Sequence, residues 1–193
     1  DIVSVRSGVG QLEKIHDAVY RWAQGHTQMA LSSINGNHSI NFGQHAHICN
    51  GKWDARTQFV DTATGSKGIK ITIPYMTERT TKYDVVAHVA EAIDHIECKA
   101  QGIKDMAESG RHNAEFAGMA RVLGLFARKG GSHGYTVELS DALKNAVDNE
   151  FNIDMTALNV LQATAQQTAA SGATPQPLRS PTTAAWRCGC DPA

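Results

Sequence analysis

The residues of this sequence best suited to chemistry lie on one predicted helix, in the segment 84–98. With about 100° of rotation per residue, Asp84, His88, Glu91, His95 and Cys98 fall within a narrow arc of that helix. Glu91 and His95 are one turn apart, so a single metal ion can accept both side chains. His88 and His95 are separated by about 10.5 Å along the helix axis, which is too far for one ion. The stripe therefore indicates a metal site on Glu91 and His95, with an ordinary surface pair of a helix as the alternative.

His112 offers a third ligand nitrogen to the same site. Gly102 stands where a left-handed residue typically ends a helix, so we expect the chain to turn back after it. The segment 109–116 then places His112 close to the start of the next predicted helix. This return of the chain favours the metal site over the surface pair.

Several short motifs around these residues resemble the SprT-like (Spartan-type) zinc metallopeptidases, especially their phage and bacterial members. The motifs are Gly102-Ile-Lys-Asp105, Gly110-Arg-His-Asn113 and Phe116, with a preceding strand at 69–73, a segment at 134–136 and a late Arg187-Cys-Gly-Cys190. The resemblance covers roughly residues 67 to 140. It implies a zincin-like fold, Zn²⁺ as cofactor, and peptidase activity on a protein substrate, with DNA or a DNA-bound protein as a further partner.

The same resemblance assigns roles to individual positions. His95 matches the second histidine of the family's His-Glu-x-x-His motif, and His112 matches the third ligand, one residue early. Glu91 then takes the place of the first histidine, and Ala92 the place of the catalytic glutamate. A peptidase zinc needs an open position for water and a carboxylate that takes its proton. Alanine supplies none, so Glu91 is either a third ligand or a base, the latter if His88 or another group binds the metal.

These readings leave three functions open. The first is a zinc-dependent metallopeptidase-type protein with His95, His112 and Glu91 as its site. The second is an inactive binding module that keeps the fold and the ion, which Ala92 favours. The third is a metal-independent phage accessory protein whose histidines are incidental.

Other clusters of ligand-type residues carry weaker predictions. Cys188 and Cys190 resemble the first half of a zinc ribbon, but a structural zinc site takes four ligands and only two are present. His45, His47 and Cys49 alternate on one face of a predicted strand, and we interpret them as ordinary strand residues. A modest basic cluster is formed by Arg121, Arg128, Lys129 and His133, and we interpret it as a solvated helix end.

The periodicity of the chain predicts an α+β fold, with an N-terminal helix, a small antiparallel sheet, the metal-site helix and further helices. An Asn35-Gly36 turn predicts a hairpin between 31–34 and 39–42. The other predicted strands are 44–49, 58–60 and 69–73, and the predicted helices are 8–24, 80–101, 113–128, one that begins after Ser140, and 155–167. We expect one domain over 1–168, a flexible linker over 169–185 and a Cys-x-Cys tail over 186–193.

Composition limits the classes of protein. The net charge is −1, which argues against a dedicated polyanion binder. No run of residues is long and apolar enough to span a membrane, and the first residues lack the apolar core of a signal peptide. Four scattered cysteines are too few for a disulfide framework, so we expect a reducing compartment and a cytoplasmic location.

Overall fold

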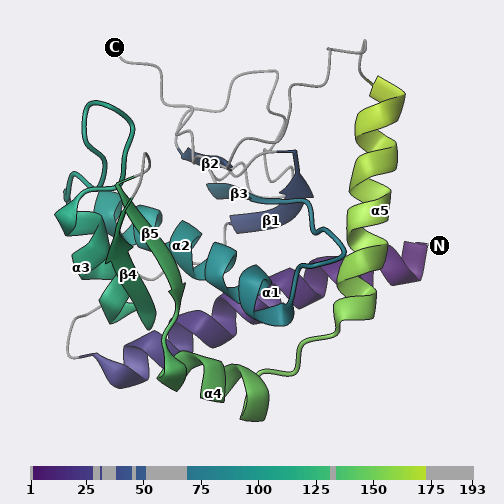
Figure 1. Ribbon diagram of the computed structural model, residues 1–193. Coiled ribbons are helices and arrows are strands. Elements are labelled where there is room, and N and C mark those ends of the chain that lie inside the picture. The colour runs from purple at the N-terminus through teal and green to yellow at the C-terminus, as the bar shows by residue number, and fades with distance from the viewer. Residues whose placement is uncertain are drawn as a thin grey trace. The chain divides into compact units, whose positions relative to one another are not determined.

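The computed structural model describes residues 2–27, 31, 38–44, 47–50, 69–130 and 134–172 of the chain (Figure 1). Its elements are, in order, α1 (Ile2–His26), β1 (His38–Gly43), β2 (His47–Asn50), β3 (Ile69–Pro74), α2 (Lys82–Ala100), α3 (Ala114–Val122), β4 (Leu125–Lys129), β5 (Tyr135–Leu139), α4 (Asp141–Asn149) and α5 (Met155–Gly172). Helices and small sheets are both present, as an α+β class requires. The chain divides into two compact units, residues 1–12, 34–76 and 155–193 in one, and residues 13–33 and 77–154 in the other.

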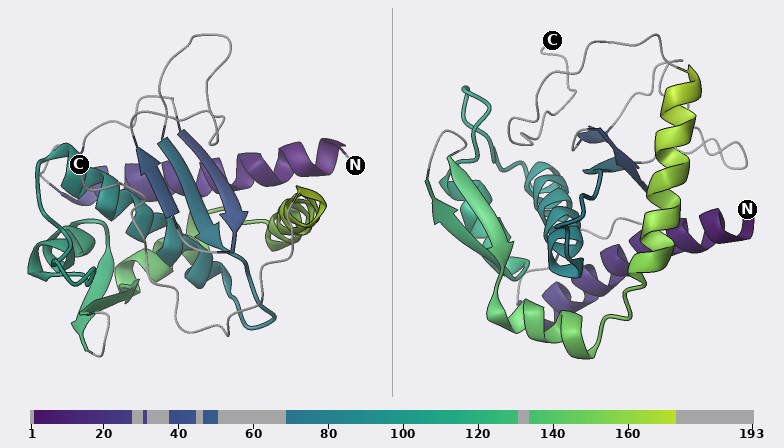
Figure 2. Two further views of the ribbon diagram at one scale, coloured as in Figure 1. Left: turned by 90° about the horizontal axis from the view of Figure 1, so that it is seen from above. Right: turned by 45° about the vertical axis from the view of Figure 1, so that its right-hand side comes forward.

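The first unit contains a three-stranded sheet in the order β1-β3-β2 (Figure 2). β2 runs antiparallel to β3, but β1 runs parallel to it, in a register that pairs His38 with Ile69 and Phe42 with Ile73. The predicted all-antiparallel sheet is therefore wrong for β1. The first strand and the turn of the predicted hairpin lie mostly among residues 32–37, outside the described residues, as does the predicted strand 58–60.

The prediction for β3 is confirmed, since the strand begins at Ile69 and ends at Pro74, which has no backbone N–H to continue a ladder. Ile71 and Ile73 are fully buried, as is Ile40 of β1. In the same unit α5 packs beside β1, and its Gln162 amide donates to the Met76 carbonyl oxygen at 3.0 Å. These contacts fix the end of β3 against α5.

The second unit is built around α2, whose predicted ends are confirmed. Thr81 caps the N-terminus, where its hydroxyl accepts from the Asp84 N–H while the Asp84 carboxylate accepts from the Thr81 N–H. At the other end Gly102 has φ +69°, the left-handed conformation expected after a helix. The predicted apolar face is buried throughout: Val85, Val86, Val89, Ile93 and Ile96.

The segment after α3 corrects one prediction. We expected one helix over 113–128, but α3 ends at Val122 and residues 125–129 form strand β4, antiparallel to β5. Along β4 buried Leu125 and Ala127 alternate with exposed side chains, a period of two that is typical of a strand. The apolar residues of this stretch fit either period, and the pairing with β5 decides between them.

The last helices agree with the sequence. Ser140 caps α4 by accepting from the Leu143 N–H at 3.2 Å. α5 begins at Met155 and continues to Gly172, so the first residues of the predicted linker 169–185 are helical. Residues 173–193, with the predicted tail, lie outside the described residues.

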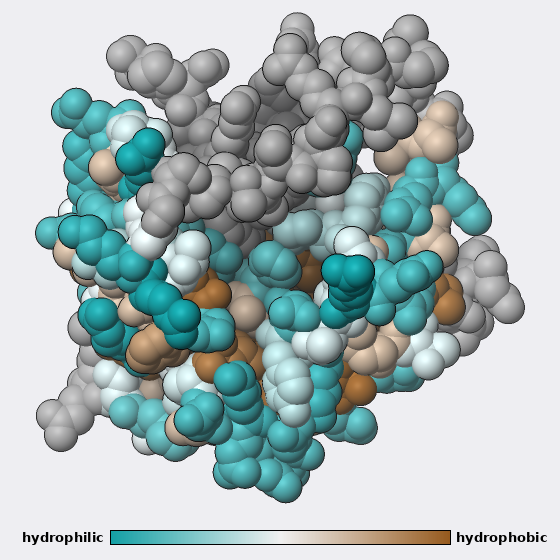
Figure 3. Space-filling view, in the orientation of Figure 1, coloured by the Kyte–Doolittle hydropathy of each residue, from teal (hydrophilic) through white to brown (hydrophobic). Residues whose placement is uncertain are grey.

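The surface of the described residues is largely hydrophilic in the view of Figure 3, with small apolar areas between polar ones. Phe126 is the one large apolar side chain of that part that is strongly exposed, at 51%. None of the helices in the described ranges has the length and apolar character of a membrane span.

Candidate metal centre

Three predicted ligands come together in the second unit. Glu91 and His95 lie one turn apart on α2, and His112 lies directly before the N-cap of α3. One ligand atom from each lies within 4.8 Å of the others, a spacing that a single metal ion can bridge. Within the described part of the chain this is the one such group of three or more ligand-type residues. The predicted convergence of these three residues is confirmed.

The three side chains are nearly buried, with 12%, 11% and 10% of Glu91, His95 and His112 exposed. The Glu91 carboxylate approaches the His112 ring, with Oε1 at 3.6 Å from Nε2. A carboxylate and two imidazoles held out of bulk water form a donor set that suits a divalent cation, since the ion replaces the hydration that the carboxylate loses.

Each histidine is oriented through its other ring nitrogen. His95 Nδ1 contacts Oδ2 of Asp105, and His112 Nδ1 lies 2.9 Å from the carbonyl oxygen of Tyr135. A carboxylate and a carbonyl oxygen only accept hydrogen bonds, so both Nδ1 atoms carry the proton. In that tautomer Nε2 has the lone pair that binds a metal, which is the usual arrangement of metal-binding histidines.

Sequence analysis did not assign a role to Asp105. It belongs to the Gly102–Asp105 motif, but nothing in the spacing showed that its carboxylate reaches His95. The turn after α2 explains the contact, because the Ile103 N–H donates to the Cys98 carbonyl oxygen at 2.8 Å and folds the chain back along the helix. A carboxylate behind a ligating histidine also makes that histidine a stronger ligand.

The main chain of His112 is held on both sides. It forms an antiparallel bridge with Met106 and a parallel bridge with Gly134. Its carbonyl oxygen accepts from the Tyr135 N–H at 3.3 Å, and the next residue, Asn113, donates its N–H to the Asp105 carbonyl oxygen at 3.1 Å. The imidazole also stacks on Phe116 with ring centroids 3.7 Å apart. These contacts explain why a residue in a loop has a defined orientation.

The other members of the predicted stripe do not join the three ligands. Asp84 is used in the N-terminal cap, and the Cys98 thiol donates to Oδ1 of Asp94 at 3.3 Å. Burial raises the pKa of Cys98, so this thiol is neutral rather than a thiolate ligand. His88 Nδ1 lies 3.9 Å from Oε2 of Glu91, and burial lowers the pKa of His88, which keeps it neutral at pH 7.

Two buried carboxyl groups on α2 were missed by the sequence analysis. Asp94 and Glu97 are both fully buried, although acidic residues are rarely found there. Burial, which is the largest cause, raises the pKa of Asp94 to about 9. Asp94 is therefore protonated at neutral pH and adds no negative charge beside His95. Eleven residues of α2 are buried, so the helix is covered on more than its apolar face. The periodicity of the sequence predicts only the apolar face.

Position 92 lacks the expected base. Ala92 is fully buried and carries only a methyl group, so it cannot accept a proton from bound water. Glu91 is the one carboxylate of the three converging residues, and its Oε1 lies 3.6 Å from Nε2 of His112. The geometry therefore favours Glu91 as a ligand over Glu91 as a base.

The predictions for the three minor clusters of ligand-type and basic residues are mostly not tested, because many of those residues are not described. The side chains of His45, His47 and Cys49 and the pair Cys188 and Cys190 lie outside them. Of the basic cluster, Arg121 is exposed on α3, whereas Arg128 on β4 pairs with Glu138 at 3.1 Å, and His133 is not described.

Comparison with known proteins does not assign this chain to a family. No family model matches this sequence, and no similar curated protein or solved structure is found. The resemblance to SprT-like metallopeptidases therefore depends on the motif residues themselves.

Replacing Asp105 by Ala is expected to weaken metal binding about 10- to 100-fold, because His95 loses the carboxylate that fixes its tautomer and ring orientation. The measurement is a competition titration of the metal-free protein with Zn²⁺ and a coloured chelator. Glu108→Ala is the matched control, since Glu108 is exposed in the same connection. Equal affinity of Asp105→Ala and the native protein would show that Asp105 does not support the site.

Replacing Gly134 by Ala is expected to lower both stability and metal affinity. Gly134 has φ +80°, and a Cβ there would overlap the carbonyl oxygen of His112, so His112 must shift. Gly102→Ala is the control, because its φ is +69° but nothing lies within 4 Å of the new Cβ. Denaturant unfolding should show a loss of about 1 kcal/mol for Gly102→Ala and a larger one for Gly134→Ala. Only Gly134→Ala should bind Zn²⁺ more weakly, and unchanged affinity in it would refute the role of this close contact.

Proposed function

We propose that this protein binds one zinc ion through Glu91, His95 and His112 and is a SprT-like domain of the metallopeptidase type that acts on a protein substrate. The observation that carries the proposal is the convergence of the three ligand atoms, with each histidine anchored through Nδ1. Helical spacing predicts Glu91 and His95 as a pair, and the family motifs match His95 and His112 to two of the family's ligands, with Glu91 at the position of the first histidine.

The donor set supports zinc in particular. Two imidazole nitrogens and one carboxylate are a common ligand set of catalytic zinc, and they leave a fourth position for water or for a substrate oxygen. Magnesium and calcium prefer all-oxygen sites, so they fit these residues poorly. A bound zinc ion would act as a Lewis acid toward a peptide carbonyl.

Charge balance also supports a divalent cation. Glu91 and Asp105 are the two carboxylates in contact with the histidines of the site. His88 is neutral because burial lowers its pKa, and Asp94 is protonated because burial raises its pKa. Two carboxylates in contact with two histidines, in a nearly buried group, form a setting that favours a bound cation.

Ala92 favours a second candidate, the inactive binding module. Removal of a proton from bound water is the task of the carboxylate that this position lacks. With Glu91 used as a ligand, the other carboxylate in contact with the three residues is that of Asp105, which is engaged with Nδ1 of His95. We therefore expect the domain to hold zinc and to cleave proteins slowly or not at all.

Partners and location follow the resemblance and the composition. A protein substrate near DNA is the partner that the family suggests. The buried Cys98 is a free thiol, consistent with the cytoplasmic location expected from the cysteine content.

The metal proposal predicts one zinc per chain in the purified protein, measured by elemental analysis. The variants Glu91→Ala, His95→Ala and His112→Ala should each lose zinc, because each removes a ligand. His88→Ala should retain it, since His88 is not one of the three converging residues and its Nδ1 lies 3.9 Å from Oε2 of Glu91. Zinc lost in His88→Ala but kept in Glu91→Ala would instead make Glu91 the base. No zinc in the native protein, even after loading, would refute the metal site.

The missing base predicts weak hydrolysis. The zinc-loaded protein should cleave unfolded protein substrates at rates at least about 100-fold below an active zinc metallopeptidase, because general-base catalysis contributes about 10²- to 10⁴-fold. The assay compares zinc-loaded protein, chelated protein and the His95→Ala variant on casein. Rapid cleavage that the chelator and His95→Ala both abolish would exclude the inactive module and restore the peptidase.

A further inference from the structure

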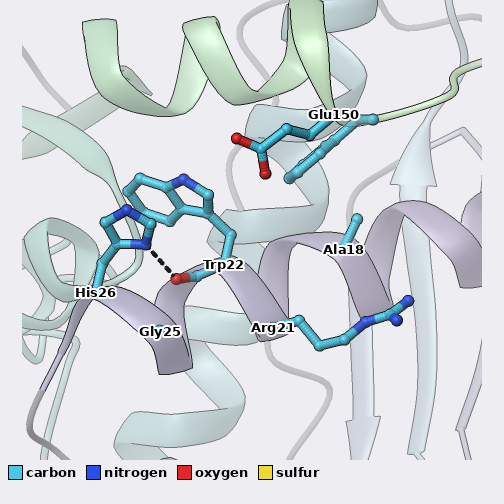
Figure 4. A pocket seen from close by; sticks show the side chains of 7 residues that line it. Ala18, Arg21, Trp22, Gly25, His26 and Glu150 are labelled. Carbon is cyan, nitrogen blue, oxygen red and sulfur yellow. Dashed lines mark hydrogen bonds between the residues drawn. The ribbon is translucent and has the colours of Figure 1, made fainter.

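A hollow of about 430 Å³ lies in the second unit (Figure 4). None of the three metal-site residues is among the residues that line it. It is formed where the last turns of α1 meet the residues that follow α4. Its lining residues are Ala18, Arg21, Trp22, Gly25 and His26 from α1, and Glu150 and Phe151 after α4.

Three aromatic rings border this hollow. Trp22 and His26 stack with centroids 4.2 Å apart and an angle of 17° between the rings, and Phe151 lies across from α1 in the lining. The indole also packs directly on Gly124, which has no side chain to displace it. His26 Nδ1 lies 2.7 Å from the Trp22 carbonyl oxygen, to which it donates. The aromatic wall is therefore held in place by contacts within the unit.

The electrostatics of the hollow favour a cation. α1 ends at His26 and α4 ends at Asn149, so the C-terminal ends of two helices, which carry partial negative charge, meet there. Glu150 is exposed, and its carboxylate points toward Trp22 in Figure 4. Among the described residues no ion pair of Glu150 is formed.

Arg21 is the one permanent cation of the lining, and its position does not cancel this field. Its Nε donates to the Asp17 carbonyl oxygen at 3.2 Å. In Figure 4 its guanidinium points away from the rings and from Glu150. The side of the hollow between Trp22 and Glu150 thus combines aromatic rings with a carboxylate.

We propose that this hollow binds an organic ammonium group, of the kind carried by a lysine or methyl-lysine side chain. Aromatic faces attract such a cation through their quadrupole, and a carboxylate adds a charge pair at the open side. The N-methyl or methylene carbons bury apolar surface against the rings at the same time. On the side away from Arg21, an anion would face two helix C-termini and Glu150, so charge complementarity there favours a cation. The site is independent of the metal centre and adds a recognition function to the domain.

The test is an NMR titration of the full chain, following the backbone amides of Gly25 and Phe151. The probes are Nα-acetyl-trimethyllysine amide, choline, and 3,3-dimethylbutan-1-ol, the uncharged isostere of choline. Both cations should shift these amides with dissociation constants of about 1 mM or weaker, as cation–π contacts at open sites allow, and the isostere should not. Tighter binding of the trimethyllysine probe than of choline assigns the site to a polypeptide side chain, and the reverse assigns it to a small molecule.

Variants separate the proposed contacts from folding. Glu150→Gln should weaken binding of the cations about two- to fivefold, the range of an exposed charge pair, while Glu108→Gln should leave it unchanged. Phe151→Leu should weaken it as well, because the leucine side chain has no ring quadrupole. Circular dichroism verifies that each variant is folded. Equal shifts with the uncharged isostere, no shifts with any probe, or full binding by Glu150→Gln and Phe151→Leu together would overturn the proposal.

Discussion

The main-chain hydrogen bonds of His112 are the constraint on which the candidate metal centre depends. Glu91 and His95 share a helix, so their spacing is fixed by the helix itself. His112 comes from a connection, and its position follows from the bridges to Met106 and Gly134. Two residues about a turn apart on one helix bind a metal weakly without a third ligand that is equally rigid. The connection between α2 and α3 is therefore as much a part of the site as the helix.

The same connection supplies the orientation of the ligands. Asp105 follows α2 by a few residues and contacts His95, while Tyr135 at the start of β5 accepts from His112. One acceptor is a charged side chain and the other is a main-chain carbonyl, so the two histidines respond differently to substitution. A mutation can remove the acceptor of His95, but only a displacement of β5 can remove that of His112.

The sequence predicted the parts of this arrangement that depend on local rules. The extent of α2, the break at Gly102, the Ser140 cap of α4 and the three ligand positions follow from periodicity, cap chemistry and motif spacing. The parallel pairing of β1 with β3 and the strand β4 did not follow, because both depend on partners distant in the chain. Asp94 was missed for a related reason: its burial comes from neighbours on other elements, whereas its residue type suggests a solvated position.

Ala92 affects one part of the proposed chemistry, general-base catalysis, and leaves the metal-binding residues unchanged. A Glu–His–His ligand set is compatible with catalytic zinc, so Glu91 in place of a histidine does not by itself prevent hydrolysis. General-base catalysis is the part that position 92 bears on, because an alanine side chain has no group that can accept a proton. The convergence of the three ligand-type residues and the hydrogen bonds of the α2–α3 connection involve other residues than Ala92. The arrangement is the one that the proposed binding module would need: three converging ligand-type residues beside a buried position that carries only a methyl group.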